Sequence, residues 1–393
     1  MARLIDLGIN VLDSKLPDVG TTIFTVMSAL AQHHQALNLS QGFPDFDGPP
    51  ELLERVHHYL THGHNQYPPM AGVAPLREAI ATKVDQLYQC RVDAEQQVTI
   101  TAGATEALFC AIAAVVRAED EVIVFDPAYD SYEPVIALQG GHTIHVPLNA
   151  QDNFSVDWQR VRDVISDKTR AIIVNSPHNP TGAVWSAEDM LTLQELVIQH
   201  GLFVISDEVY EHIVFDQQPH HSVCRYPDLF ARSFVISSFG KTYHVTGWKV
   251  GYCVAPAALT DEFRRIHQFV NFTVNTPVQL GLADYLAQYP EHHLQLPDFY
   301  QAKRDLFCDA LAASRFKLVP SAGTYFQLLD YSDISQEQDV ELARRWTEEI
   351  KIASIPVSVF YADPHQLTTP VLRFCFAKQD NTLLHAAEVL CQL

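Results

Sequence analysis

A lysine and an aspartate in the middle of the sequence each stand at the end of an apolar, β-rich run. Lys241 follows the run Ser233–Ser237, and Asp207 ends the run Leu202–Asp207. A lysine in an apolar environment loses its proton readily, and the free amine can attack an aldehyde. A buried carboxylate needs a cationic partner, of which a protonated pyridine nitrogen is one. Capping of a following helix is the alternative role for Asp207.

The triplet Gly240-Lys241-Thr242 also occurs in nucleotide-binding P-loops. A P-loop requires a glycine five residues before Gly240, and that position is Val235, inside an apolar run. We therefore reject a P-loop. Ser238 and Lys249, on either side of Lys241, instead offer a hydroxyl group and a cation to a phosphate.

Small residues lead from the run Val98–Thr101 into a helical segment. The stretch Ala102-Gly103-Ala104-Thr105-Glu106 would place free backbone N–H groups at a helix N-terminus, which favours a phosphate. The Thr105 hydroxyl can add a hydrogen bond. A plain strand-to-helix turn is the alternative, and this segment alone would favour that alternative.

Three further residues follow strand-like runs. Tyr129 comes after Glu121–Asp126, and its flat ring could stack on a planar cofactor, with ordinary packing as the alternative. Asn179 lies in a loop shaped by two prolines and can donate from its amide, with an Asx turn as the alternative. Tyr210, three residues after Asp207, can turn its hydroxyl to the same side.

Arg373 stands inside an apolar run near the C-terminus. A buried guanidinium needs an anion, and its planar fork suits a carboxylate. An internal salt bridge is the alternative. If the residues above act on an amino acid, the carboxylate of that substrate is the favoured partner.

Alternating strands and helices must position these residues. Helical patterns such as Glu106–Val116 and Ala187–His200 separate almost continuously apolar runs. This predicts an α/β fold with a large domain built on a mostly parallel, doubly wound sheet, whose ligands bind at the carboxyl ends of the strands. The strands are expected at Val98–Thr101, Glu121–Asp126, Arg170–Asn175, Leu202–Asp207, Ser233–Ser237 and Val250–Ala255.

The pattern changes after about residue 280 to longer helices and the short strands Thr324–Asp330 and Val371–Phe376. We predict an N-terminal arm with part of a small domain over residues 1–45. A large domain is expected over residues 46–284, and a smaller α+β domain over residues 285–393.

Composition excludes several classes of protein. The formal net charge of -21 disfavours nucleic acid and anionic membranes as partners. Seven scattered cysteines indicate reduced thiols in a cytoplasmic protein, and neither a signal peptide nor an apolar span is recognisable. No H-E-x-x-H occurs, so we expect no metal site. The clustered His57, His58, His62 and His64 are expected on a solvated helix face.

Together these segments resemble the class I aminotransferases of fold type I, which depend on pyridoxal 5'-phosphate. The resemblance spans nearly the whole chain and is carried by Asn38–Phe46, Pro177–Pro180 and Ser237–Gly251. The chain is most similar to the branch that holds kynurenine aminotransferases and glutamine transaminase K. Within that branch it looks most like the bacterial methionine aminotransferases, through Asn38–Gly48, Thr101–Leu108 and Ser237–Pro256.

The resemblance implies a role for each candidate residue. Lys241 carries the cofactor as a Schiff base and shuttles the proton between Cα and C4′, while Asp207 pairs with the pyridinium nitrogen. Tyr210 and Asn179 bind the ring O3′, and Tyr129 stacks on the ring. The resemblance places Gly103, Ala104, Thr105, Ser238 and Lys249 around the phosphate.

The resemblance also implies a homodimer and a carboxylate clamp. Tyr67 is expected to reach the phosphate of the neighbouring subunit, so the active sites are shared. Arg373 and Asn179, with the backbone near Gly42, hold the substrate carboxylate, and Phe24 lines the side-chain pocket. Lys249 stands where many relatives have arginine. A lysine at this position departs from the bidentate phosphate binding of those relatives.

The implied reaction is a ping-pong transfer of the amino group of methionine, an aromatic amino acid or histidine to a 2-oxo acid. No second arginine occurs in Asn271–Thr276, which disfavours aspartate or glutamate as donor. A cysteine S-conjugate β-lyase and a kynurenine or glutamine transaminase are the enzymatic alternatives. A non-catalytic, DNA-binding regulator on this fold is disfavoured by the acidic charge and the short stretch before Gln41.

Overall fold

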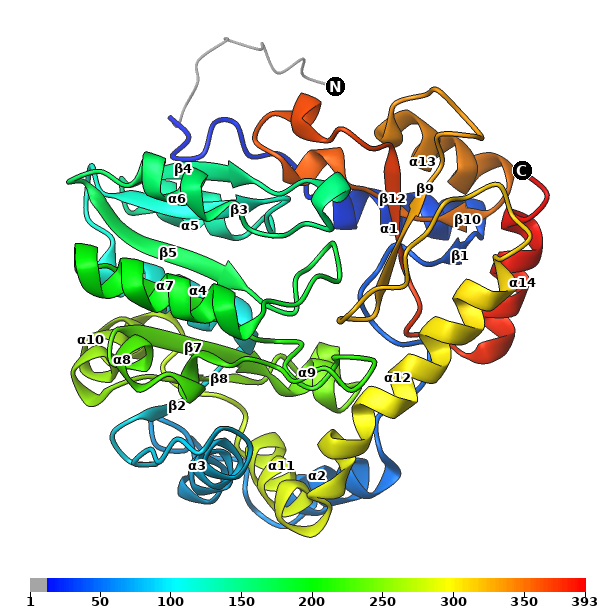
Figure 1. Cartoon of the computed structure of the whole chain (residues 1–393). Coiled ribbons are helices and arrows are strands. Elements are labelled where there is room, and N and C mark those ends of the chain that lie inside the picture. Colours follow the sequence, from blue (N-terminus) through cyan, green and yellow to red (C-terminus); the bar gives the residue numbers. More distant parts are fainter. Residues whose placement is uncertain (1–12) are drawn as a thin grey trace, which may run out of the picture.

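The computed structural model describes residues 13–393. Residues 1–12, which include the start of the predicted N-terminal arm, lie outside this described part. Two bodies, each built on its own sheet, lie side by side in Figure 1. Helix α12 (Glu291–Ala310), drawn in yellow, runs diagonally from the bottom of the larger body up to the smaller one.

Seven strands in the order β2-β8-β7-β6-β5-β3-β4 form the larger sheet. The five from β7 to β4 are parallel, and β8 runs antiparallel to both of its neighbours. This confirms the predicted α/β fold with a mostly parallel sheet. The strands are β2 (Val98–Thr101), β3 (Glu121–Asp126), β4 (His142–Pro147), β5 (Thr169–Asn175), β6 (Phe203–Asp207), β7 (Ser233–Ser238) and β8 (Gly251–Val254).

Both faces of this sheet are covered, because successive strand residues enter different cores. Ile172 and Val174 of β5 join one core, together with residues of α3 (Ala74–Tyr88), α7 (Ala187–His200) and α11 (Thr276–Gln288). Ala171 and Ile173 join the other core, against α4 (Gly103–Val115) and α10 (Ala257–Val270). Burial on both faces explains why the parallel strands read as continuous apolar runs.

One strand of the larger sheet, β4, was not predicted from the sequence. β4 lies at the edge of the sheet and has three polar residues among its first four, His142, Thr143 and His145, and only its last two residues are buried. An edge strand with partial exposure lacks the continuous apolar signature that identified the central strands. The other six strands lie within one or two residues of their predicted bounds.

Strand direction brings the candidate residues to one edge. Asp207 ends β6, and Lys241 follows β7, which is parallel to β6. Because β8 is antiparallel to both β2 and β7, β2 is directed like β7. The turn that follows β2, from Ala102 to Thr105, therefore arrives at the same edge.

The smaller body is an α+β unit. Its antiparallel sheet has the order β11-β12-β9, and a separate parallel pair joins β1 (Leu37–Asn38) to β10 (Ile352–Ala353). The predicted strands near residues 324–330 and 371–376 are confirmed as β9 (Phe326–Asp330) and β12 (Val371–Cys375). The remaining elements are α1 (Ile23–His34), α13 (Asp339–Glu349), β11 (Ile355–Pro356) and α14 (Asp380–Leu390).

The predicted domain boundaries near residues 45 and 284 stay a prediction, which helix packing supports. α11 packs against α2 (Pro50–Thr61) and α3, whereas the next helix, α12, packs against α14. The change of partner thus falls between α11 and α12. At the other boundary, α1 packs against α13 of the smaller body.

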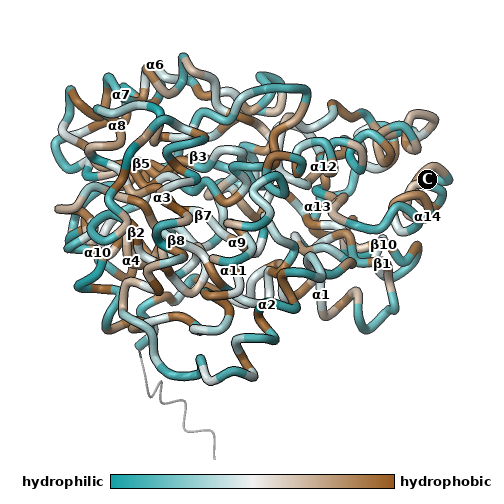
Figure 2. The backbone as a smooth tube through the Cα atoms, turned by 90° about the horizontal axis from the view of Figure 1, so that it is seen from below, coloured by the Kyte–Doolittle hydropathy of each residue, from teal (hydrophilic) through white to brown (hydrophobic). Residues whose placement is uncertain are grey.

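Hydropathy along the chain follows this layering. In Figure 2, hydrophobic brown stretches run through the interior strands, and hydrophilic teal is common in the outer loops and helical turns. Within residues 13–393, none of the helices combines the length and the apolar character that crossing a lipid bilayer requires.

Candidate active site

A cavity of about 160 Å³ opens at the carboxyl edge of the larger sheet. Most of the predicted site residues meet there, although they come from separate loops. Gly42 and Arg373 adjoin the cavity from the side of the smaller body, through contacts with Lys241 and Asn179. The predicted residues that line it are Gly103, Ala104, Thr105, Tyr129, Asn179, Asp207, Tyr210, Ser238, Lys241 and Lys249.

Lys241 lies on α9 (Phe239–Thr242), a single helical turn directly after β7. Its Nζ donates a hydrogen bond to the Gly42 carbonyl at 3.0 Å and faces the rings of Tyr210 and Tyr325, 5.7 and 5.6 Å from their centroids. Burial lowers the pKa of Lys241 to about 8, because the surrounding protein solvates the ammonium form less well than water does. A substantial fraction of the amine is therefore unprotonated and nucleophilic near neutral pH.

Asp207 is buried at the end of β6. Tyr132 donates its hydroxyl to Oδ2 at 2.7 Å, and the Val209 N–H reaches Oδ1 at 3.3 Å. Burial raises the pKa of Asp207 to about 6, and these two hydrogen bonds oppose the rise. The capping alternative is wrong, because turns rather than a helix follow Asp207.

Arg373 enters from β12 and is buried. Its Nη1 donates to Asn179 Oδ1 at 2.7 Å and its Nη2 to the Ser40 carbonyl at 2.8 Å, while Nε has no partner among residues 13–393. Both partners are neutral, so neither contact is a salt bridge. Burial lowers the pKa of Arg373 to about 10, so the guanidinium still carries its charge, and no carboxylate among residues 13–393 lies within salt-bridge distance of it.

The opposite end of the cavity suits a phosphate. The N-terminus of α4, a 13-residue helix, is directed at it, and Lys249 donates to the Thr105 hydroxyl at 3.3 Å. Gly103 has φ +74, and a Cβ there would come within 3.3 Å of Lys249 Nζ. Only glycine adopts this conformation readily and leaves room for the cation. Free N–H groups and a lysine together complement a phosphate group.

Two predicted residues lie outside the cavity. The Phe24 ring packs 5.6 Å from that of Phe360, and the Arg373 guanidinium lies 5.2 Å from the Phe24 centroid. Tyr67 is 84% exposed and contacts Phe272 edge-on at 5.7 Å. Tyr67 lines a separate surface pocket, together with Pro68 and Thr273, and not the cavity around Lys241. Its predicted role in a neighbouring subunit stays a prediction.

Sequence reasoning missed several residues that support the site. Asn175, at the end of β5, donates to the Asp207 carbonyl at 2.9 Å and accepts from the Asn179 N–H at 2.9 Å. Its place at a strand end was a usable signal. Tyr132 and Tyr325 gave no such signal, because their contacts with Asp207 and with the Gly42 carbonyl depend on tertiary packing.

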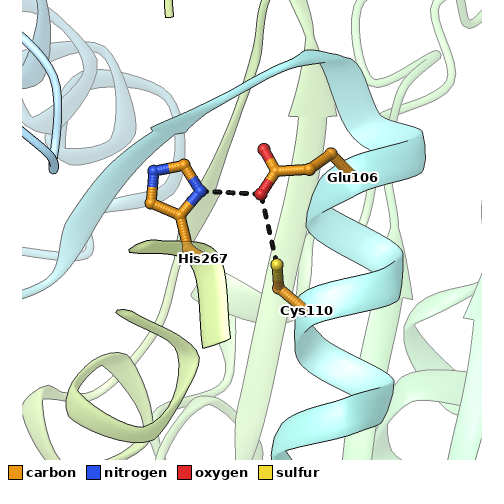
Figure 3. A group of neighbouring side chains, drawn as sticks. All are labelled: Glu106, Cys110 and His267. Atoms are coloured by element: carbon orange, nitrogen blue, oxygen red, sulfur yellow. Dashed lines mark hydrogen bonds and ion pairs between the residues drawn. The ribbon is translucent and has the colours of Figure 1, made fainter. Parts of the chain in front are cut away.

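Glu106, Cys110 and His267 form a separate group that has the geometry to hold a metal ion, and it is the one such group within residues 13–393 (Figure 3). Its atoms already take part in hydrogen bonds with one another and with the backbone. The expectation of no metal site stays a prediction. The predicted exposure of the four clustered histidines, which lie on and directly after α2, is confirmed.

Comparison with known proteins identifies relatives along the whole chain. A family model described as aminotransferase class I and II matches residues 34–390. The chain is 56% identical to methionine aminotransferase of Escherichia coli, over 97% of the chain and 98% of the relative. It is 32% identical to human kynurenine–oxoglutarate transaminase 1, over 90% and 91%.

Solved structures of aminotransferases are similar to this chain over almost its whole length. The crystal structure of an Escherichia coli protein with methionine aminotransferase function superposes with a TM-score of 0.95 at 56% identity, covering 98% of this chain and 100% of the other. N-succinyldiaminopimelate aminotransferase from Mycobacterium tuberculosis gives a TM-score of 0.93 at 38% identity, covering 97% and 99%.

We expect the reaction of Lys241 with pyridoxal phosphate in the cofactor-free protein to accelerate with pH and to level off above about 8. Only the neutral amine attacks an aldehyde, and its fraction rises as the pH passes through the pKa. Stopped-flow absorbance measures the rate, and the same titration with a free amine corrects for ionisation of the aldehyde. The Lys241→Ala variant should give no such signal, and a corrected rate independent of pH would contradict the assignment.

Proposed function

The chain belongs to the class I and II aminotransferases, and we propose that it transfers the amino group of methionine to a 2-oxo acid. Aromatic amino acids and histidine are proposed as further donors. The observation that carries the choice of methionine is the 56% identity, along almost the whole chain, to the methionine aminotransferase of Escherichia coli. The family uses pyridoxal 5'-phosphate, whose aldehyde accepts the amino group and whose ring withdraws electrons from the substrate Cα.

We assign the cofactor contacts from the cavity. Asp207 would hold the ring nitrogen, and Tyr210 and Asn179 the ring O3′, while Tyr129 would stack on the ring. Carboxylate burial and the Tyr132 hydrogen bond position Asp207 for this role. Above a pH of about 6 Asp207 is an anion, the form that keeps a pyridine nitrogen protonated. The phosphate contacts would be Gly103, Ala104, Thr105, Ser238 and Lys249, joined by Tyr67 of a second copy.

Lys241 is proposed to move the proton at the substrate Cα. A pKa of about 8 lets the amine accept and return a proton near neutral pH without a large driving force in either direction. The Gly42 carbonyl accepts a hydrogen bond from its Nζ and so restricts where the amine points. The Tyr210 and Tyr325 rings beside it limit the access of water.

Arg373 is proposed to hold the substrate α-carboxylate, with Asn179 and the backbone near Gly42. Its guanidinium is kept in place by Asn179 and by the Ser40 carbonyl, both neutral acceptors that leave its charge uncompensated. A carboxylate supplies the missing anion with charge-assisted hydrogen bonds. One clamp serves both half-reactions, since the amino acid and the oxo acid carry the same carboxylate.

The side-chain pocket is proposed to be apolar. Phe24 and Phe360 pack together beside Arg373, and Val274 is buried. Asn275 caps α11 by accepting from the Val278 N–H, so its oxygen is already engaged. A buried side-chain carboxylate would need a cation that Asn271–Thr276 does not offer. This favours methionine over aspartate and glutamate.

We also propose a homodimer with shared active sites. Tyr67, Phe269, Val270 and Phe272 are large apolar residues with exposed fractions from 45% to 87%, and Tyr67 contacts Phe272. We call these four residues the apolar patch. Contiguous exposed apolar surface is typical of an interface. A cytoplasmic location stays a prediction, for which the seven free cysteines remain the argument.

Methionine should convert the purified, cofactor-loaded protein to its amino form, and kcat/KM for methionine should exceed that for aspartate by about 100-fold or more, as an unpaired buried carboxylate implies. Visible spectra follow the first half-reaction, and a coupled oxo-acid assay follows turnover. The donors tested alongside are kynurenine, glutamine and histidine. Preference for kynurenine would replace methionine, and pyruvate formed from a cysteine S-conjugate without an oxo acid would indicate a β-lyase.

Arg373→Lys should lower kcat/KM for methionine by about 10- to 100-fold, mainly through KM, because lysine keeps the charge but loses the planar fork. Cofactor absorbance should not change. Arg345→Lys, on the exposed face of α13 where Arg345 pairs with Glu337, is the matched control and should leave both constants unchanged. Unaltered KM values for methionine and the oxo acid in the Arg373 variant would rule out the clamp.

Phe269→Glu should shift the protein from dimer towards monomer, because it places a charge in the apolar patch, where Phe269 is 87% exposed. Analytical ultracentrifugation measures the association constant. Leu191→Glu is the control, since Leu191 is 54% exposed on α7 and outside the patch. If both variants associate as tightly as the unmodified protein, the patch is not the dimer interface.

A further inference from the structure

Glu106 forms a hydrogen-bonded centre just behind the phosphate end of the cavity. Its Oε2 accepts from the backbone N–H of Ala102, the residue that precedes α4, at 2.8 Å. Its Oε1 accepts from Cys110 Sγ at 3.2 Å and from His267 Nδ1 at 2.6 Å. Figure 3 shows Glu106 and Cys110 on one face of α4 and His267 approaching from a second helix, α10.

His267 makes a second contact on its far side. Its Nε2 lies 3.1 Å from the carbonyl oxygen of Met70, and its side chain is fully buried. The ring of His267 therefore bridges the Glu106 carboxyl group and a backbone carbonyl, with one ring nitrogen directed at each. Burial raises the pKa of Cys110, which keeps it a neutral thiol donor.

The two ends of this chain of contacts belong to different parts of the proposed machinery. Ala102 is followed at once by Gly103, Ala104 and Thr105, which line the cavity. Met70 lies in residues 66–73, here called the Tyr67 segment. The contact between Glu106 and His267 thus joins the phosphate end of the chain's own site to the segment that carries Tyr67 out to the surface.

Neighbouring contacts hold the Tyr67 segment on its other side. Thr276 donates to the Gln66 carbonyl at 2.6 Å, and Thr273 to the Pro69 carbonyl at 3.2 Å. Thr273 lies between α10 and α11 and Thr276 is the first residue of α11, whereas His267 connects the segment to α4. Loss of either side chain leaves a buried polar group of the other without its hydrogen-bond partner, so both ends of the link would loosen together.

We propose that Glu106 and His267 are a positioning pair, which holds the phosphate-binding turn of one active site in register with the Tyr67 segment that completes the site of a second copy. The proposal rests on the proposed cofactor contacts and dimer. Neither residue touches the cofactor in this scheme. Each acts through backbone groups, Ala102 N–H on one side and the Met70 carbonyl on the other.

The test compares Glu106→Gln and His267→Asn with Cys110→Ala, which removes a donor to the same carboxylate without touching either backbone group. The dissociation constants of pyridoxal phosphate and of pyridoxal, which lacks the phosphate, are measured by titration of cofactor-free protein. We expect the first two variants to weaken pyridoxal phosphate by roughly tenfold or more, as the loss of charge-assisted contacts implies. Pyridoxal should be weakened much less, and Cys110→Ala should change neither by more than about twofold.

Combination with Tyr67→Phe tests the link to the second copy. If His267 acts through the Tyr67 segment, His267→Asn should weaken pyridoxal phosphate less in the Tyr67→Phe background than in the unmodified protein. If the double variant weakens pyridoxal phosphate binding by the product of the two single-variant factors, the proposed coupling between His267 and Tyr67 is refuted. If Tyr67→Phe alone leaves the dissociation constant of pyridoxal phosphate unchanged, the proposed contact of Tyr67 with the second copy's phosphate is refuted instead. The comparison of Glu106→Gln with Cys110→Ala then still tests the role of Glu106 at the Ala102 N–H.

Folding is checked by circular dichroism and thermal unfolding. If Glu106→Gln does not fold, Glu106→Asp takes its place, because it keeps the charge but shortens the reach to the Ala102 N–H. Equal weakening of pyridoxal and pyridoxal phosphate in the folded variants would reduce the pair to a general structural role. Variants that bind pyridoxal phosphate as tightly as Cys110→Ala would refute the proposal outright.

Discussion

Burial of charge at one edge of the sheet is the constraint on which the rest of the site depends. Lys241, Asp207 and Arg373 are held where water cannot solvate them well, and burial shifts the pKa of each towards its neutral form, to about 8, 6 and 10. The groups that form hydrogen bonds with these three side chains are neutral, and the charged groups around them are more distant. The protein therefore presents two cationic groups and one acid that the ions of a cofactor and a substrate can complete.

The fold makes that concentration of charge possible. Parallel strands bring Asp207 and Lys241 to one edge, and the turn after β2 meets them there because β8 reverses direction between β2 and β7. Arg373 is contributed by a different sheet, in the smaller body. The proposed carboxylate clamp and the proposed phosphate-binding residues are therefore contributed by two separate cores, which would set the orientation of a ligand that carries both groups.

Much of this could be read from the sequence, for a physical reason. Strands buried on both faces are apolar throughout, so the central strands and the polar residues just after them were visible without any tertiary information. The edge strand β4 was missed because its polar residues remain partly exposed. Pairwise contacts were equally hidden: the capping role considered for Asp207 fails because no helix follows it, and its actual partner, Tyr132, lies 75 residues away. Tyr67 was expected to act in a neighbouring subunit, and its 84% exposure leaves that expectation a prediction.

Glu106 illustrates the limit most clearly. In the sequence it is an acid in the first turn of a predicted helix, where a carboxylate favours the free N–H groups of the helix end. The structure retains that local role through the Ala102 N–H but adds a partner 161 residues away, His267. The same side chain thus accepts a hydrogen bond at the start of α4 and contacts a buried imidazole ring. Its local role near the helix terminus and its long-range contact are therefore joined, and the helix end involved is the one proposed to bind a phosphate.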